Sequence, residues 1–225
     1  MRVCTWTWPF PFGVRLGWAT AGVPNPDPQT ARARVYLLRG NAVIFSRGLG
    51  LLCGRLRRRG IWAEDLRCVG DRWVLRHLAG DQRRGRLRGP IIFVGHSCGG
   101  RYSLFAAHQL QRLGIRVDLL VCLDVALPPE VPANVTRAVN LYLTRRRLYP
   151  ACPLRPARDS AAQVENIDLS AASSPVKAAW LNHLNLTDSP QVQAMVLEHI
   201  LRTVEEPLAK IRNFTDIGRP AEIRY

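Results

Sequence analysis

Short apolar runs alternate with amphipathic stretches along most of the chain. Continuous apolar runs are typical of strands that are buried on both faces, and they predict strands over residues 35–38, 66–69, 91–94, 117–123, 135–143 and 164–169. Apolar positions at helical spacing predict helices over residues 43–59, 72–80, 99–113 and 190–204. This alternation predicts an α/β fold: a three-layer sandwich with a mostly parallel sheet and helices on both faces.

The ends of two predicted helices carry capping signals. Gly114 follows the helix over 99–113, where a residue with a left-handed backbone commonly closes a helix. Thr187, Asp188 and Ser189 offer capping side chains before the last helix, and Pro190 suits its first turn.

The N-terminal stretch differs from the rest of the chain. Residues 1–30 are expected to be a disordered leader or a signal-like segment, and residues 31–225 a single domain. The leader ends near Ala21 in a small-residue pattern like a signal-peptidase site, but Pro9, Pro11 and Arg15 interrupt its apolar segment. We therefore expect a cytoplasmic protein, or an exported one if residues 1–21 act as a signal. No stretch of about 20 apolar residues predicts a transmembrane helix.

The net charge is strongly positive, at +15 from 32 basic and 17 acidic residues. Only Lys177 and Lys210 among the basic residues are lysines, and the arginine-rich runs at 55–59, 83–88 and 145–147 contain no aromatic residue. A single-strand nucleic-acid binder combines basic and aromatic side chains. We interpret the arginines as solvated surface and expect no nucleic-acid partner, with a binder of nucleic acid or anionic membrane as the alternative.

The cysteines do not form a metal-binding pattern. The chain has six, none in CxxC spacing, at positions 4, 53, 68, 98, 122 and 152. Several lie within apolar runs, which favours buried reduced thiols over a disulfide framework. We expect no metal and no organic cofactor.

The sequence Gly-His-Ser-Cys-Gly-Gly at 95–100 joins a predicted strand to a predicted helix. A tight strand-to-helix turn strains its central residue and leaves no room for side chains on the flanking residues. Gly95 and Gly99 have no side chain and therefore fit such a turn. Such a turn lifts the Ser97 hydroxyl clear of the sheet. It also leaves the backbone N–H of Cys98 free to bind a developing oxyanion.

This strand–GHSCGG–helix stretch resembles the nucleophile elbow of the α/β-hydrolase superfamily, especially its lipase, esterase and thioesterase-like members. The resemblance covers about residues 33–204. It implies a catalytic triad in the chain order serine, acid, histidine. The short span between the predicted acid and base implies a minimal fold with no large lid.

His183 is the histidine that fits the base of this triad. The chain has five histidines, and His77 precedes the serine, while His108 and His199 lie within predicted helices. His96 adjoins the serine, and elbow geometry is expected to point its side chain away from the site. His183 follows the last predicted strand and precedes the capped final helix, where the family keeps its base.

Asp124 is the favoured acid. It ends the apolar run after the elbow, at the strand edge where ligands bind in open parallel sheets. Most of the superfamily places the acid one strand later, but that strand here runs into Thr144 and three arginines. Asp168 is the alternative acid, and Asp159 a third candidate.

The second oxyanion donor is expected in the loop after the first strand. This loop reads Leu38-Arg39-Gly40-Asn41-Ala42, with Arg-Gly where the family often has His-Gly. The backbone N–H of Asn41, or that of Ala42, would join that of Cys98.

These residues together predict a serine hydrolase that cleaves a carboxylic ester or thioester through an acyl-enzyme intermediate. The expected partner is a small acyl substrate. The alternatives are a catalytically silent hydrolase fold that acts as a binding module, and an acyltransferase on the same scaffold.

Overall fold

The six strands of the described residues form one sheet in the order β2-β1-β3-β4-β5-β6, and each neighbouring pair is parallel. This computed structural model describes residues 23–41, 46–144, 152–171, 173–174, 176 and 180–217, with side chains as far as residue 205. The strands are β1 Arg34–Leu38, β2 Trp62–Leu66, β3 Ile91–His96, β4 Val117–Leu123, β5 Val135–Tyr142 and β6 Gln163–Asp168.

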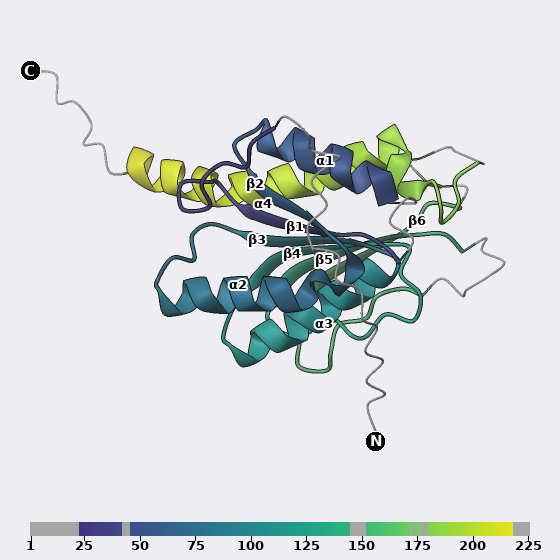
Figure 1. The fold of residues 1–225 in the computed structure, drawn as a ribbon, viewed down its shortest axis with the longest axis horizontal. Coiled ribbons are helices and arrows are strands. Elements are labelled where there is room, and N and C mark those ends of the chain that lie inside the picture. The colour runs from purple at the N-terminus through teal and green to yellow at the C-terminus, as the bar shows by residue number, and fades with distance from the viewer. Residues whose placement is uncertain are drawn as a thin grey trace, which may run out of the picture.

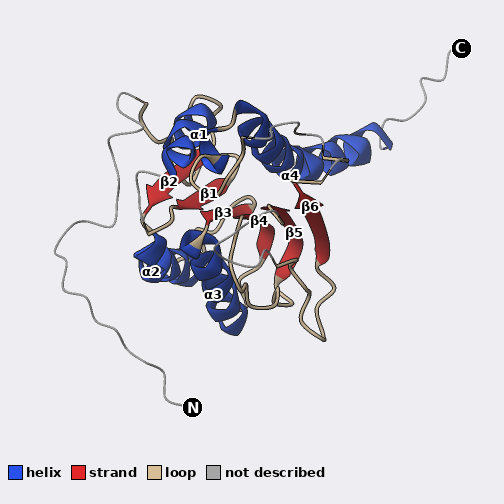
Figure 2. Cartoon of the chain, turned by 90° about the vertical axis from the view of Figure 1, so that its right-hand side faces the viewer, coloured by secondary structure: helices blue, strands red, loops and turns tan. Residues whose placement is uncertain are grey.

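Helices cover both faces of the sheet, so the molecule has three layers. Helices α1 and α4 lie on one face and α2 and α3 on the other (Figures 1 and 2). The α-helices are α1 Arg47–Arg57, α2 Asp71–Arg83, α3 Cys98–Arg112 and α4 Pro190–Ile217, with short 3-10 helices η3 Cys68–Gly70 and η4 Leu186–Asp188. The fold class predicted from the sequence is confirmed.

Two apolar cores lie on either side of the sheet, because successive side chains of a strand point to opposite faces. In β1, Val35 and Leu37 join the core under α1 and α4. Tyr36 and Leu38 join the core under α2 and α3. A strand with no polar face reads as a continuous apolar run, which is why the sequence pattern locates β1, β3 and β4 well.

The strand predicted at 66–69 is wrong. The strand in this region is β2, four residues earlier, and Cys68–Gly70 forms η3. Glu64 and Asp65 interrupt the apolar pattern of β2, yet both are buried. They tolerate burial because Asp65 pairs with Arg39 and Glu64 lies 3.7 Å from Arg57, and both arginines lie outside β2.

Helix α4 continues to Ile217, beyond the predicted end at residue 204. Gly114 has a φ of +65°, as expected of a residue that follows a helix. In the described residues, no helix is both long and apolar enough to cross a membrane. Most of the predicted leader, residues 1–22, lies outside the described residues.

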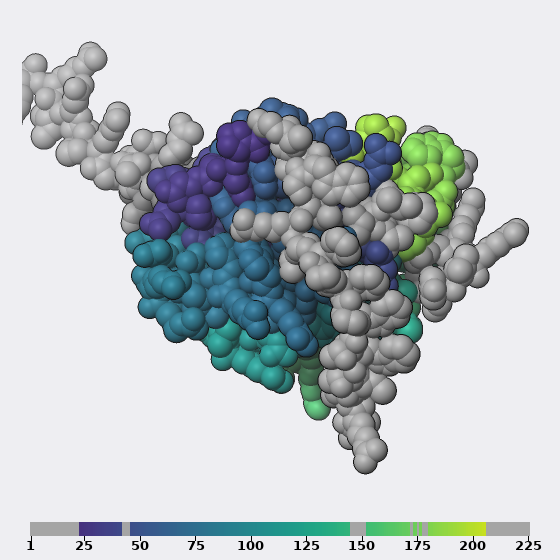
Figure 3. Space-filling view, viewed as in Figure 1, coloured from purple at the N-terminus to yellow at the C-terminus, as the bar shows by residue number. Residues whose placement is uncertain are grey.

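The segment before β1 packs along the free edge of β2. The Asn25 side chain donates to Ala63 O (3.0 Å) and accepts from Ala63 N–H (2.9 Å), which satisfies backbone groups that an edge strand leaves open. Figure 3 shows this segment in purple beside the surface of α2.

Candidate active site

Ser97 occupies a strained turn between β3 and α3. Its φ of 55° and ψ of −124° lie outside the regions that non-glycine residues ordinarily adopt. The Ser97 N–H donates to Leu123 O at the end of β4 (2.9 Å), and Ser97 O accepts from Gly100 N–H (3.1 Å). Strained residues of this kind cluster at functional sites, because the surrounding structure must hold them in place.

The glycines around Ser97 are required by close backbone packing. A Cβ atom would lie 2.4 Å from Gly100 Cα at position 95, 2.1 Å from Leu38 O at position 99, and 2.2 Å from Val125 Cγ2 at position 100. Real Cβ atoms do not approach other atoms this closely, so each position excludes a side chain.

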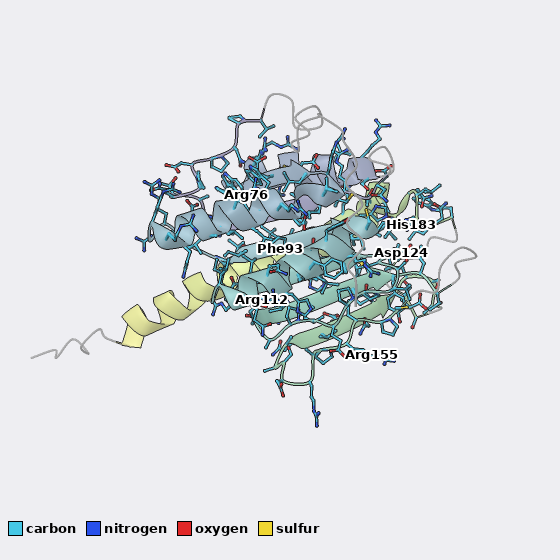
Figure 4. The ribbon with its side chains drawn as sticks, turned by 60° about the horizontal axis from the view of Figure 1, so that its bottom comes forward. Arg76, Phe93, Arg112, Asp124, Arg155 and His183 are labelled. Carbon is cyan, nitrogen blue, oxygen red and sulfur yellow. The ribbon has the colours of Figure 1, made fainter. Side chains whose placement is uncertain are left out.

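Asp124 and His183 form a hydrogen-bonded pair across 59 residues of sequence. The His183 Nδ1 atom lies 3.0 Å from Asp124 Oδ2 (Figure 4). Asp124 is 1% exposed, and Leu143 N–H reaches its other carboxylate oxygen at 3.4 Å. A carboxylate accepts hydrogen bonds, so Nδ1 carries the proton of the neutral ring and Nε2 is left as the basic nitrogen.

Ser97 lies at the same sheet edge as this pair. His96 is in register with Leu123, so the next residues, Ser97 and Asp124, leave neighbouring strands side by side. The rings of His96 and His183 are packed with their centroids 4.7 Å apart, which brings the His183 loop to the elbow. The three predicted triad residues thus come from three segments that converge at the carboxyl ends of β3 and β4.

His96 does not point away from the site, contrary to expectation. It is 1% exposed, its Nε2 lies 3.0 Å from His183 O, and its Nδ1 lies 2.8 Å from Ser46 Oγ. Sequence reasoning missed both His96 and Ser46 as parts of the site. His96 could have been considered because it precedes Ser97 directly in the sequence. Nothing in the sequence marks Ser46 as a residue near the site.

The loop after β1 passes beside the nucleophile. A Cβ atom at Gly40 would lie 3.3 Å from Ser97 Cβ, and Gly40 N–H donates to Ser46 Oγ (3.0 Å). The Asn41 carboxamide oxygen accepts from the thiols of Cys68 (3.0 Å) and Cys98 (3.2 Å). Asn41 and Cys98, the two predicted oxyanion donors, are therefore neighbours, while Ala42 lies outside the described residues.

The thiols near this loop differ in acidity. A hydrogen bond from Cys98 lowers the pKa of Cys68, and the same contact, together with burial, raises the pKa of Cys98. Burial raises the pKa of Cys53, in the core under α1, to about 12. No group of three His, Cys, Asp or Glu side chains within the described residues is arranged to hold a metal ion.

The alternative acids have other surroundings. Asp168 accepts from Thr144 Oγ1 (2.7 Å) and Ser170 Oγ (2.6 Å). Burial acts to raise the pKa of Asp168, but these hydrogen bonds outweigh it and lower that pKa below its ordinary value. Asp159 lies in a turn between β5 and β6.

The remaining histidines lie on helices and contact residues outside the site. His77 Nδ1 lies 3.1 Å from Tyr36 Oη, and His108 Nε2 lies 2.9 Å from Glu130 O. His199 Nδ1 lies 3.4 Å from the guanidinium of Arg137.

No family model and no curated protein matches this chain. Solved structures do. The thioesterase domain of NocB from the nocardicin cluster is 14% identical, with 80% of this chain and 97% of that chain covered and a TM-score of 0.46. A Klebsiella pneumoniae protein named as a dienelactone hydrolase is 15% identical over 82% and 89% of the two chains (TM-score 0.48). Est1E from Butyrivibrio proteoclasticus is 13% identical over 78% and 90% (TM-score 0.42).

Similarity at these levels assigns neither the fold nor the chemistry, and both rest on the chain's own residues. The sheet order β2-β1-β3-β4-β5-β6 is wholly parallel in the described residues, and a strained serine follows β3. With helices on both faces of that sheet and the Asp124–His183 pair at its carboxyl edge, the chain has the α/β-hydrolase fold in a minimal form.

Proposed function

We propose that this protein is a serine hydrolase that cleaves a carboxylic ester or thioester, with Ser97 as nucleophile, His183 as base and Asp124 as acid. The observation that carries the proposal is the 3.0 Å contact between His183 Nδ1 and the buried carboxylate of Asp124, next to the strained Ser97 turn. A serine hydroxyl is a weak nucleophile until an oriented base accepts its proton.

The reaction follows from these roles. Ser97 Oγ bonds to the carbonyl carbon while its proton passes to His183 Nε2, and the carbonyl oxygen becomes an oxyanion. The backbone N–H groups of Cys98 and Asn41 bind that oxyanion. Cys98 is the first residue of α3, where no preceding helical turn supplies a carbonyl for its N–H. His183 then gives its proton to the leaving alcohol or thiol, and the acyl-enzyme forms.

Water completes the cycle by the same steps in reverse. His183 Nε2 takes a proton from water as the water oxygen attacks the acyl carbon. The proton returns to Ser97 Oγ when the free carboxylic acid departs. Asp124 stabilises the imidazolium in both halves of the reaction.

Exposed apolar side chains near the triad favour an apolar acyl group. Leu127, three residues after Asp124, is 63% exposed, and Trp180 and Leu184, which flank His183, are 55% and 48% exposed. Large apolar side chains left in water beside a polar site are typical of a binding surface. The substrate we propose is a small or extended acyl ester or thioester that lies along this rim.

Replacing Ser97 tests the proposal. The Ser97→Ala variant should lose hydrolysis of p-nitrophenyl acetate to the background level and should no longer react with a fluorophosphonate probe. Ser160→Ala is the matched control, because its hydroxyl donates to Pro132 O (3.3 Å) and accepts from Ala162 N–H (3.2 Å), in a loop outside the site. Peptide mapping of the labelled wild type should place the probe on Ser97.

Two outcomes would contradict the proposal. Wild-type protein that the probe does not label has no activated serine, which is the behaviour of a silent binding module. Labelling without hydrolysis, together with transfer of the acyl group to an added alcohol or amine, would indicate an acyltransferase.

A further inference from the structure

A chain of buried hydrogen bonds runs beneath the proposed triad and links three of its segments. Gly40 N–H, in the loop after β1, donates to Ser46 Oγ (3.0 Å). Ser46 Oγ lies 2.8 Å from His96 Nδ1, and His96 Nε2 lies 3.0 Å from His183 O. Ser46 and His96 are both almost completely buried, so water does not compete for these contacts.

The donor and acceptor of each of these hydrogen bonds follow from the atoms at the two ends of the series. A carbonyl oxygen only accepts, so in the neutral ring the proton lies on His96 Nε2 and is donated to His183 O. His96 Nδ1 is then an acceptor and receives the Ser46 hydroxyl proton. Ser46 Oγ in turn accepts from Gly40 N–H, and every member of the chain has a partner.

The same ring also supports the His183 imidazole directly. The two rings are packed with centroids 4.7 Å apart and planes 37° apart. Asp124 binds the ring of His183 at Nδ1, and this contact does not involve the backbone of His183. The bond to His183 O fixes that backbone, and the loop carries no regular helix or strand from 180 to 185.

We propose that His96 is a positioning residue for the base: its Nε2–H donates to His183 O while its Nδ1 accepts from Ser46, so that it fixes the backbone and the ring of His183 and couples them to the Gly40 loop beside the nucleophile. This inference rests on the proposed function and deepens it. This role of His96 differs from simple packing, because it depends on a hydrogen-bond donor at one particular ring nitrogen.

Two amide substitutions separate these possibilities. The amide of His96→Gln reaches as far as Nε2 and can still donate to His183 O. The amide of His96→Asn reaches only as far as Nδ1, so it keeps a partner for Ser46 and loses the bond to His183. The matched control is His108→Asn, because His108 Nε2 also bonds to a backbone carbonyl, Glu130 O, but on the exposed face of α3.

The measurements are kcat and KM for p-nitrophenyl acetate and the rate of fluorophosphonate labelling of Ser97. We expect His96→Asn to lower kcat and the labelling rate about tenfold, the equivalent of one lost hydrogen bond, with KM little changed. His96→Gln should stay within about threefold of wild type, and His108→Asn should equal wild type. Equal rates for the Asn and Gln variants, or a change in KM alone, would overturn the proposal.

A measurement on the unaltered protein covers the case in which His96→Asn does not fold. Long-range ¹H–¹⁵N spectra distinguish the two histidine tautomers, and His96 should appear with a protonated Nε2 and a bare Nδ1. The opposite tautomer would refute the inference. If wild-type protein is not labelled at Ser97, the proposed function fails; if it is labelled but His96 has the wrong tautomer, only the positioning role fails.

Discussion

Asp124 combines burial with an unusual backbone. Its φ is 51°, and its side chain faces the protein interior at the end of β4. A non-glycine residue in this region costs about 1–3 kcal/mol, so neighbouring contacts must hold it. Asp124 N–H donates to Leu141 O of the adjacent strand (2.8 Å), which fixes the residue where its carboxylate meets His183.

Replacing this carboxylate by an amide should remove activity without unfolding the protein. In Asp124→Asn, the amide can donate to His183 Nδ1, so the ring proton moves to Nε2. A protonated Nε2 cannot accept the proton of Ser97. We expect kcat to fall by about 10⁴-fold, the loss seen when a triad histidine is held in the wrong tautomer. Steady-state hydrolysis of p-nitrophenyl acetate measures the loss, and far-UV circular dichroism checks the fold.

Asp168→Asn is the matched comparison. Its carboxylate binds Thr144 and Ser170, so the substitution should leave kcat within about threefold of wild type. If Asp168→Asn instead removes activity while Asp124→Asn retains it, the assignment of the acid is reversed.

Some residues of the proposed site could be predicted from the sequence and others could not, for a physical reason. Ser97, Asp124 and His183 were predicted because a strained turn, a strand end and a loop position each leave a local mark in the sequence. His96 and Ser46 have roles that depend on which atoms meet across 50 residues, and no local pattern records that.

At the scale of the elements, the packing of α3 against the end of β1 depends on a glycine. Gly99→Ala would place a Cβ atom 2.1 Å from Leu38 O and 2.6 Å from Arg39 O, so β1 and α3 would have to separate. We expect a loss of about 3 kcal/mol or more in the free energy of unfolding, at the upper end for overpacking. Urea denaturation measures this loss.

Gly54→Ala in α1 is the control for a glycine without such a constraint. A Cβ atom there meets only Arg58 Nη1, at 3.8 Å. Because alanine stabilises a helix interior relative to glycine, stability should rise by about 0.5–1 kcal/mol. If both variants behaved alike, close packing at the elbow would not be the reason for its glycines.

The accuracy of the strand predictions followed burial and local composition. Strand β4 was predicted at its observed bounds, because an uninterrupted apolar run reports a strand buried on both faces. Strand β2 was missed because two of its five residues are acidic, and their burial depends on arginines in β1's following loop and in α1. A buried polar residue that is paired with a residue of another element cannot be distinguished in the sequence from a surface residue.

At the scale of the whole molecule, the proposed catalytic residues and one buried ion pair lie at opposite ends of the strands. Ser97 and Asp124 follow the carboxyl ends of β3 and β4. Arg34 starts β1 at the other end, is fully buried, and binds Asp81 of α2 at 2.6 Å. Its guanidinium also donates to Arg86 O (2.8 Å), so the Arg34 side chain links β1, α2 and the loop that follows α2.

This separation predicts a variant that loses stability but keeps activity. Asp81→Ala leaves the buried Arg34 guanidinium without its carboxylate, and breaking a buried pair from one side costs about 3–5 kcal/mol. The double variant Arg34→Met/Asp81→Leu removes both charges and should recover most of that loss, because no buried charge is then left unpaired. Thermal denaturation gives the stabilities, and fluorophosphonate labelling well below the melting temperature should proceed at the wild-type rate in both. Slower labelling of the folded Asp81→Ala protein would show that the two ends of the sheet are coupled, since the site would then depend on a charge at the far end of the strands.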